Sequence, residues 1–272
     1  MTTLCSSFRR EAGAVWSRMQ IAANLGISLS EETITETAVY NLAVVHQQKD
    51  FRIDLATKAA ESKHGADWEW WFTKGNTGIC FRVQAKRLFP NGKYSSLAKP
   101  KSHSSPYEQL DKLVESASTD GHEALYCFYN FPHPHIVQTG ANPCRHDYRR
   151  PSFWGCTLAF PHEVKAKKSN SITALLPIMF PWHALVCGNS STSSLPDAAN
   201  DFVGRRGRAR LPLRKIPDHI LSLIDLGDAR RSEAPDSFID ADLNALELFG
   251  AERKSDTSRE LGGVAVFRDM RD

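Results

Sequence analysis

Two neighbouring segments of the chain carry side chains that together could bind a metal ion. Asp67 and Glu69 alternate with tryptophans in the first segment, and Gln84 and Lys86 alternate with apolar residues in the second. Because alternate side chains of a β-strand lie on one face, the two acids share a face, and so do Gln84 and Lys86. If the strands pair, two carboxylates, an amide oxygen and an ammonium group converge on one patch of sheet. Such a group can hold a divalent cation and activate a water molecule beside it.

The elements around these residues can be predicted from local pattern. Residues 73–78 form a glycine-containing turn, so the strands near 67–73 and 78–88 are expected to pair as a hairpin. Ser30 followed by acidic residues suits the start of a helix that runs to about Val45. The other expected elements are a helix over 7–23, a strand over 53–57, a long loop over 89–105, a helix that opens at Pro106 and a buried strand over 124–130.

The second half of the chain gives weaker signals. Residues 155–160 are expected to form a strand that leads into a helix, and residues 181–187 another strand. Residues 188–201 have the composition of a loop, and residues 215–226 that of a last amphipathic helix. From residue 227 the chain becomes acidic and polar, which predicts a peripheral tail. We therefore expect a main domain over residues 1–190 and a C-terminal basic segment, helix and polar tail over residues 191–272.

Composition limits the class of protein. The 272 residues carry a net charge of +3, and 41% of them are hydrophobic, which is ordinary for a folded soluble protein with a sizeable core. The first residues lack the apolar core of a signal peptide, and the apolar stretch over 172–188 is too short and too interrupted by proline to span a bilayer. The six cysteines are scattered, which favours reduced thiols in a cytoplasmic protein.

The order of elements, with Asp67 on one strand, Gln84-x-Lys86 on the next and Gln109 on the following helix, resembles the PD-(D/E)xK nuclease superfamily. The resemblance is closest to members with Gln-x-Lys, as in Mrr-type restriction and Holliday-junction-resolvase-like domains. The segment that contains Tyr107 and Gln109 is also similar to the Tyr-x-x-Gln helix of RecB-like nucleases. Residues 65–71, 83–88 and 126–130 further resemble an uncharacterised bacterial protein family. The resemblance covers residues 30–135.

This resemblance implies a fold, an activity and a set of site residues. The fold is a restriction-endonuclease-like α/β domain with a mixed central sheet flanked by helices. The activity is Mg²⁺- or Mn²⁺-dependent hydrolysis of phosphodiester bonds, in DNA, by a metal-activated water, with a role in host defence or DNA processing. Asp67 is the central ligand, Gln84 ligates through its side-chain oxygen without adding charge, and Lys86 lies beside the attacking water. Glu32 is the preferred acid from the early helix, and Gln109 orients the site or contacts a phosphate.

Several of these assignments have alternatives. Glu36 lies one turn after Glu32 and is the second choice for the helix acid, while Glu69 could compensate for the missing charge of Gln84. Tyr107 is an additional candidate beside Gln109. A favourable interaction with the helix dipole is the alternative for the acids at the helix start, and a place on a helix surface is the alternative for Gln109. Trp68 and Trp70 are expected to pack in the core rather than to stack on bases.

Basic residues outside the central group are candidates for phosphate contacts, which would give salt-dependent, sequence-blind affinity. They are Arg87, Lys99, Lys101, Arg205, Arg206, Arg208 and Arg210. A solvated basic linker is the alternative for the last four. The scattered cysteines and histidines match no compact zinc pattern.

Three classes of function therefore remain open. The preferred one is a metal-dependent nuclease that acts on DNA and has no membrane partner. The first alternative is a nucleic-acid-binding module that keeps the fold without cleavage, motivated by the neutral Gln84. The second is a structural or interaction protein in which the acids and the lysine form an ordinary ion-pair network. The sequence does not distinguish DNA from RNA as the substrate, or endo- from exo-cleavage. It also leaves the oligomeric state open, and a homodimer is one option.

Overall fold

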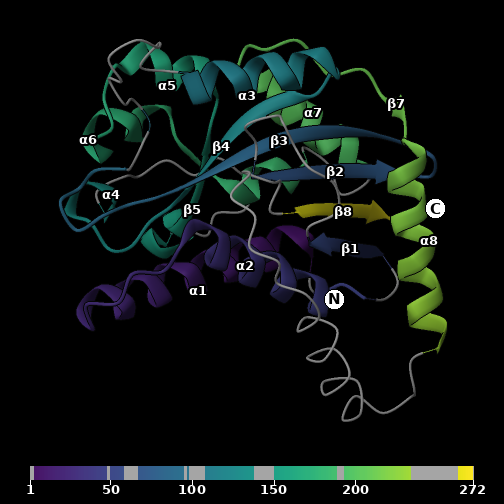
Figure 1. Ribbon diagram of the computed structural model, residues 1–272, viewed down its shortest axis with the longest axis horizontal. Coiled ribbons are helices and arrows are strands. Elements are labelled where there is room, and N and C mark those ends of the chain that lie inside the picture. The colour runs from purple at the N-terminus through teal and green to yellow at the C-terminus, as the bar shows by residue number, and fades with distance from the viewer. Residues whose placement is uncertain are drawn as a thin grey trace.

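The computed structural model is an α/β fold in which helices flank a mixed sheet (Figure 1), which confirms the expected fold class. The structure describes residues 3–47, 50–57, 67–94, 97, 108–137, 150–188, 193–233 and 263–271. In these ranges, no helix combines the length and the apolar character that crossing a membrane requires.

The helices and strands follow one another along the whole chain. The α-helices of the described part are α1 (Leu4–Asn24), α2 (Glu31–Val45), α3 (Glu108–Thr119), α4 (Pro134–Val137), α5 (Pro161–Lys167), α6 (Ile172–Leu175), α7 (Leu195–Arg205) and α8 (Asp218–Glu233). Short 3-10 helices are η1 (Pro151–Gly155), η2 (Leu176–Ile178) and η3 (Trp182–Val186). The strands are β1 (Phe51–Thr57), β2 (Trp68–Lys74), β3 (Thr77–Arg87), β4 (Glu123–Tyr129), β5 (Cys156–Ala159), β6 (Phe180–Pro181), β7 (Arg214–Lys215) and β8 (Gly263–Asp269).

The strands form one sheet in the order β1-β8-β2-β3-β4-β5-β6, and β7 pairs with β3. Strand β8 runs antiparallel to β1 and parallel to β2. Strands β2 and β3 form an antiparallel hairpin, and β3 runs parallel to β4. The sheet is therefore mixed, and its centre holds β2, β3 and β4.

Strand β8 corrects the expectation of a peripheral tail. Its residues 263–269 form an internal strand of the sheet, between β1 and β2, and Phe267 stacks on Phe72 of β2 with ring centroids 4.9 Å apart. Residues 264–267 form a continuous apolar run, which is typical of a strand covered on both faces. The prediction of a polar, peripheral C-terminus is wrong for these residues, because they complete the core sheet.

Two further predictions in the second half are wrong. Residues 182–186 form η3 instead of a strand, and the Trp182 indole nitrogen donates to the Phe8 carbonyl over 2.7 Å. Residues 195–201, expected as loop, belong to α7, where the Ser194 hydroxyl accepts from the Asp197 amide and Pro196 lies in the first turn. Both residues favour a helix start, and the polar composition of the preceding segment obscured them.

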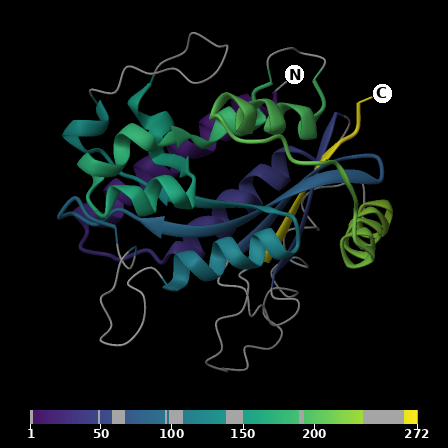
Figure 2. The same ribbon diagram turned by 90° about the horizontal axis from the view of Figure 1, so that it is seen from above.

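Helices cover both faces of the sheet. Helices α1 and α7 lie on one side, and α3 and, nearer the hairpin end, α8 lie on the other (Figure 2). Trp68 and Trp70 point to the first side and are each 1% exposed in the main core, as expected. Trp71 points to the second side and packs with α8 residues such as Ile220. The face that carries Asp67 and Gln84 is thus the face on which α3 packs.

Candidate active site

The β2–β3 hairpin places Asp67 opposite Gln84. Trp68 pairs with Val83 and Glu69 with Arg82, and the Asp67 amide donates to the Val83 carbonyl over 2.9 Å. The turn between the strands uses Gly75 at φ +54°, a conformation that glycine adopts without steric cost. The hairpin register therefore brings the acid and the amide onto one face, as their alternation predicts.

Four residues named from the sequence form one hydrogen-bond chain, here called the Asp67–Lys86 chain. The Lys86 ammonium lies 3.3 Å from Oε1 of Gln109, and Nε2 of Gln109 donates to Oε1 of Gln84 over 2.9 Å. Nε2 of Gln84 in turn donates to Oδ2 of Asp67 over 2.5 Å. The chain joins Asp67, the residue directly before β2, to β3 and to the first turn of α3, so it depends on the tertiary packing of all three elements.

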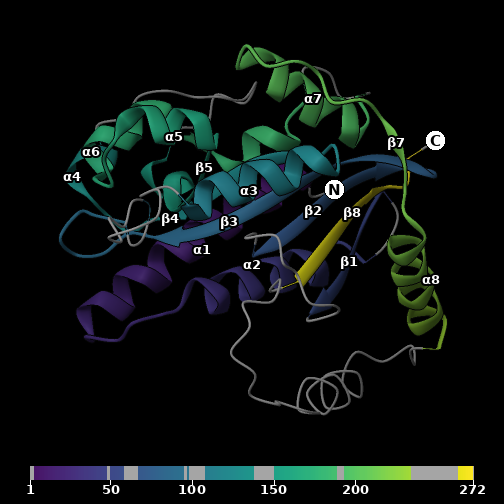
Figure 3. The ribbon, with the colours of Figure 1, turned by 45° about the horizontal axis from the view of Figure 1, so that its top comes forward.

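Helix α3 is held against the sheet by its apolar face. Leu110 and Leu113 are at most 2% exposed and pack against Tyr126 and Phe128 of β4. Gln109, which precedes the first of these leucines, is half-buried and points to the β3 side chains. Figure 3 shows α3 lying along β3 and β4. Apolar packing of α3 thus fixes the position of the Gln109 amide.

Asp67 lies in an environment that opposes its ionisation. Burial raises the pKa of the Asp67 carboxyl, and the negative charge of Glu31 raises it further. The Ala85 amide, which donates to Oδ2 over 2.8 Å, and the Lys86 charge lower the pKa, but the net shift is upward. A carboxylate in this position gains from a bound cation or proton, since burial without a full counter-charge costs free energy.

The acid of α2 whose charge acts on Asp67 is Glu31. Its carboxylate also lies 3.9 Å from Nε of Arg87. Glu32, the acid preferred from the sequence, is exposed, and Glu36 is half-buried one turn later. Successive helix residues are rotated by about 100° around the helix axis. Which of the adjacent acids Glu31 and Glu32 faces Asp67 therefore depends on how α2 packs.

Glu69 belongs to a separate buried cluster on the same face. Its carboxylate accepts from Nε of Arg82 over 3.2 Å and from the Trp71 indole over 3.4 Å. Arg82 also donates to Asp120, 2.5 Å away, at the end of α3. Because these contacts engage Glu69, the expectation that it compensates for the neutral Gln84 finds no support in its hydrogen bonds.

The predicted basic residues have different surroundings. The Arg87 guanidinium lies over the Phe89 ring, 4.1 Å from its centroid. Arg206 donates to Glu163 over 3.0 Å, Arg208 to Glu123 over 2.8 Å, and Arg210 pairs with Asp201. Arg205 lies at the end of α7. Lys99, Lys101 and Tyr107 lie outside the described residues. Phosphate contacts through Arg206 or Arg208 would compete with these carboxylates.

The oxygen donors near Asp67 are of the kind that Mg²⁺ and Mn²⁺ prefer, because both are hard cations. The donors are the carboxylates of Asp67 and Glu31 and the side-chain oxygen of Gln84. In the structure Gln84 turns its nitrogen to Asp67 and its oxygen to Gln109. Within the described part of the chain, no three His, Cys, Asp or Glu side chains group into a metal site. The oxygen atoms are therefore of the type that binds a hard cation. The site offers little negative charge, however, because Gln84 is neutral.

Sequence reasoning missed two contributors to this site, Glu31 and the Ala85 amide. Glu31 directly follows the N-cap residue Ser30. Its place in the first helical turn was the feature of the sequence that could have identified it as a site residue. The Ala85 amide carries no side-chain signal, since a backbone donor is defined only by strand register.

A model of a family of unknown function (DUF6615) matches residues 4–271, nearly the whole chain. No curated protein and no solved structure is detectably similar to the chain.

Proposed function

We propose that this chain, which belongs to the DUF6615 family of unknown function, is a metal-dependent nuclease with its active site at the Asp67–Lys86 chain. The observation that carries the proposal is this chain of hydrogen bonds. It joins an acid, an amide and a lysine of a hairpin to a glutamine of the next helix. The chain leaves the Asp67 carboxylate, which is half-buried and whose pKa burial raises, without a direct ion pair in the described contacts.

The order of elements supports the same proposal. Helix α2, strands β1, β2 and β3, helix α3 and strand β4 follow one another, and β4 runs parallel to β3. This is the order in which the PD-(D/E)xK resemblance places its acid, its Asp, its Gln-x-Lys and its Gln. The insertion of β8 between β1 and β2 is a departure that leaves the β2–β3–β4 part intact.

Each residue has a definable role in phosphodiester hydrolysis. Asp67, Gln84 and Glu31 would hold Mg²⁺ or Mn²⁺, which supplies Lewis acidity and an acidified water when bound. The Lys86 ammonium offsets the negative charge that develops on the phosphate. Gln109 positions Lys86 and Gln84 through its two side-chain hydrogen bonds, so it is a positioning residue.

The test is cleavage of plasmid, linear and single-stranded DNA by the purified protein with Mg²⁺, with Mn²⁺ and with EDTA. We expect metal-dependent cutting that is lost in Asp67→Ala and in Lys86→Ala. Lys74→Ala is the matched control, because Lys74 is an exposed lysine of the same hairpin. Cutting that persists in EDTA or in both site variants would contradict the proposal.

One observation favours a second candidate, a nucleic-acid-binding module without cleavage. The Asp67 carboxylate is satisfied within the protein by Gln84 and by the Ala85 amide, and burial raises its pKa. This candidate predicts that wild type and Asp67→Ala bind DNA equally and that neither cuts it.

A further inference from the structure

A pocket of about 260 Å³ opens beside the last residues of β3. Its walls are the end of α1, the turn between α1 and α2, the segment that follows β3, and a residue after β4. The lining residues are Met19, Ala22, Ala23, Gly26, Ile27, Ser28, Leu29, Arg87, Leu88, Phe89, Pro90 and Phe131. We call it the Phe89 pocket. Its volume is close to the lower end of the range, about 300–1,000 Å³, of small-ligand sites.

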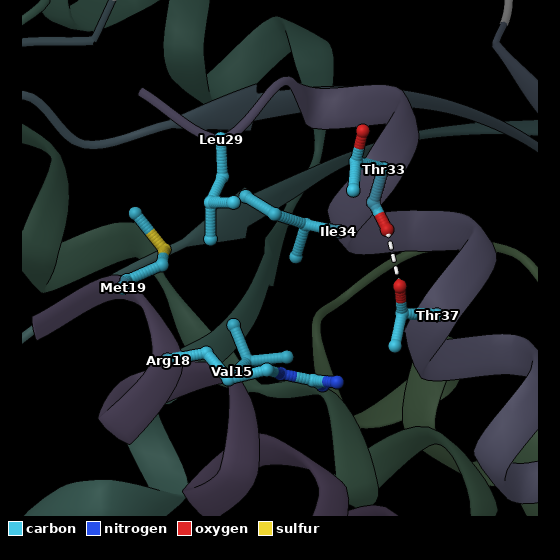
Figure 4. A pocket seen from close by; sticks show the side chains of 7 residues that line it. All are labelled: Val15, Arg18, Met19, Leu29, Thr33, Ile34 and Thr37. Carbon is cyan, nitrogen blue, oxygen red and sulfur yellow. Dashed lines mark hydrogen bonds between the residues drawn. The ribbon is translucent and has the colours of Figure 1, made fainter. Parts of the chain in front are cut away.

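A smaller space lies next to it between α1 and α2. Its volume is about 70 Å³, and Met19 and Leu29 line both spaces. Figure 4 shows these two side chains together at one end of the smaller space, with Val15 and Ile34 further in. The smaller space is a gap in the packing of two helices, whereas the Phe89 pocket is large enough for a planar ring.

The Phe89 pocket combines aromatic surface with a cation. Phe89 and Phe131 provide rings, and the Arg87 guanidinium lies over the Phe89 ring. Ile27 is 56% exposed, so part of the apolar lining faces solvent. An aromatic surface beside an arginine suits a nucleobase and its phosphate, because bases stack on aromatic rings and phosphates pair with guanidinium groups.

The pocket and the Asp67–Lys86 chain meet at one charged pair. Arg87 follows Lys86 on β3, so their side chains leave the strand in opposite directions. Glu31 approaches Arg87 to 3.9 Å, and its charge also acts on Asp67. A strand of nucleic acid that passes this pair would therefore reach Lys86 on one side and the Phe89 pocket on the other.

We infer that the Phe89 pocket receives an unstacked base of a single-stranded nucleic acid, whose backbone runs past Arg87 toward Lys86. This inference rests on the proposed function and deepens it by naming single strands, or the unpaired ends of duplexes, as the substrate. A base within a duplex is stacked on both faces and cannot enter such a pocket without leaving the helix.

The test measures binding in EDTA, so that cleavage plays no part. The probes are a fluorescent oligothymidylate of about 12 nucleotides, an abasic strand of equal length, and a blunt duplex. By anisotropy at fixed salt, we expect the oligothymidylate to bind about tenfold more tightly than either of the others, on the typical strength of one stacked base.

Ala23→Trp probes the pocket directly, because Ala23 is an exposed residue of α1 that lines it. The added indole should fill the pocket and remove the preference for the strand with bases. Ala229→Trp is the matched control, since Ala229 is an exposed alanine of α8 outside the pocket. Thermal unfolding of both variants shows whether they fold.

The outcomes separate this inference from the nuclease proposal. A preference for the oligothymidylate that Ala23→Trp removes supports the inference even if no DNA is cut. Equal binding of all three probes, no binding, or a preference that Ala23→Trp leaves unchanged overturns the inference. Metal-dependent cutting of duplex DNA that depends on Asp67 would then leave the nuclease proposal standing.

Discussion

The side-chain nitrogen of Gln84 lies 2.5 Å from Oδ2 of Asp67, so a neutral amide lies beside a half-buried carboxylate at the point where β2 begins. This contact stabilises the protein without metal, because the amide offers a donor where a second carboxylate would repel Asp67. It also limits the negative charge that the site offers to a cation.

The Gln84→Glu substitution should lower the stability of the metal-free protein and raise its affinity for a divalent cation. Two carboxylates at this distance disfavour each other's ionisation, so we expect a loss of about 1–2 kcal/mol in EDTA, or about 2–8 °C in Tm. Adding Mn²⁺ should then raise the Tm of this variant more than that of wild type. Gln84→Met is the control, since it removes the hydrogen bonds without adding a ligand. A Mn²⁺ response of Gln84→Glu no larger than that of wild type would contradict the assignment of Gln84 as a metal-facing position.

Asp67→Asn should raise stability at neutral pH. The folded-state pKa of Asp67 is raised, so the folded protein binds this proton more tightly than the unfolded chain does. Stability is therefore highest below the unfolded pKa, about 4, and falls as the pH rises through the folded value. Removing the charge should add on the order of 1 kcal/mol at pH 7, and the gain should vanish toward pH 4.

Asp269→Asn is the matched control with the opposite sign. Hydrogen bonds and charge from Arg271 lower the pKa of Asp269 against the opposing effect of burial, and its carboxylate also accepts from the Leu195 amide. Its contribution is present above the unfolded pKa and is lost as the pH falls through the folded value. Asp269→Asn should therefore lower the Tm at pH 7 and have less effect in acid. Tm curves between pH 4 and 8 that shift alike for both variants would contradict this account.

Arg208→Leu should destabilise the fold more than Arg210→Leu. Arg208 donates three hydrogen bonds, of 2.8, 3.1 and 3.3 Å, to Glu123, whose side chain is 12% exposed and whose pKa burial raises. Removing Arg208 leaves this carboxylate without its cation, which should cost about 1–3 kcal/mol. Arg210 is 65% exposed, so its replacement should change the Tm little. Equal Tm values for the two variants would show that the Arg208–Glu123 pair has no structural role.

Local sequence pattern was sufficient to predict the hairpin. The alternation of Asp67 and Glu69 with tryptophans, and of Gln84 and Lys86 with apolar residues, defines the two faces of β2 and β3. The glycine-containing turn then determines the register. It was harder to predict which acid of helix α2 faces the site. Glu31 and Glu32 differ by one helical step, and only the packing of α2 decides which of them approaches Asp67.

The position of β8 in the sheet could not be predicted from local sequence pattern, for a different reason. Residues 264–267 carry a strand signal, but its neighbours β1 and β2 are about 200 positions earlier in the chain. A local pattern does not indicate between which two strands of the sheet a segment will lie. A place for Gln109 at the site was expected only through a family resemblance, since β3 and α3 are joined by a long segment, and its hydrogen bond to Gln84 was not predicted.

Gly227 should be intolerant of alanine, because α8 packs closely against β1 at this point. A Cβ at Gly227 would lie 2.3 Å from Oδ1 of Asp54, a side chain that is 1% exposed and paired with Arg231 and Arg268. Since Asp54 is held by these two arginines, it cannot move aside freely, and Gly227→Ala should cost about 1–3 kcal/mol. Gly204→Ala is the control, because Gly204 lies in α7 and an added Cβ would meet no atom within 4 Å apart from its chain neighbours and its own helix backbone. There alanine should stabilise the helix by about 0.5–1 kcal/mol. Chemical denaturation of the two variants measures both effects. A Gly227→Ala variant as stable as Gly204→Ala would show that α8 does not pack on Asp54 as the structure places it.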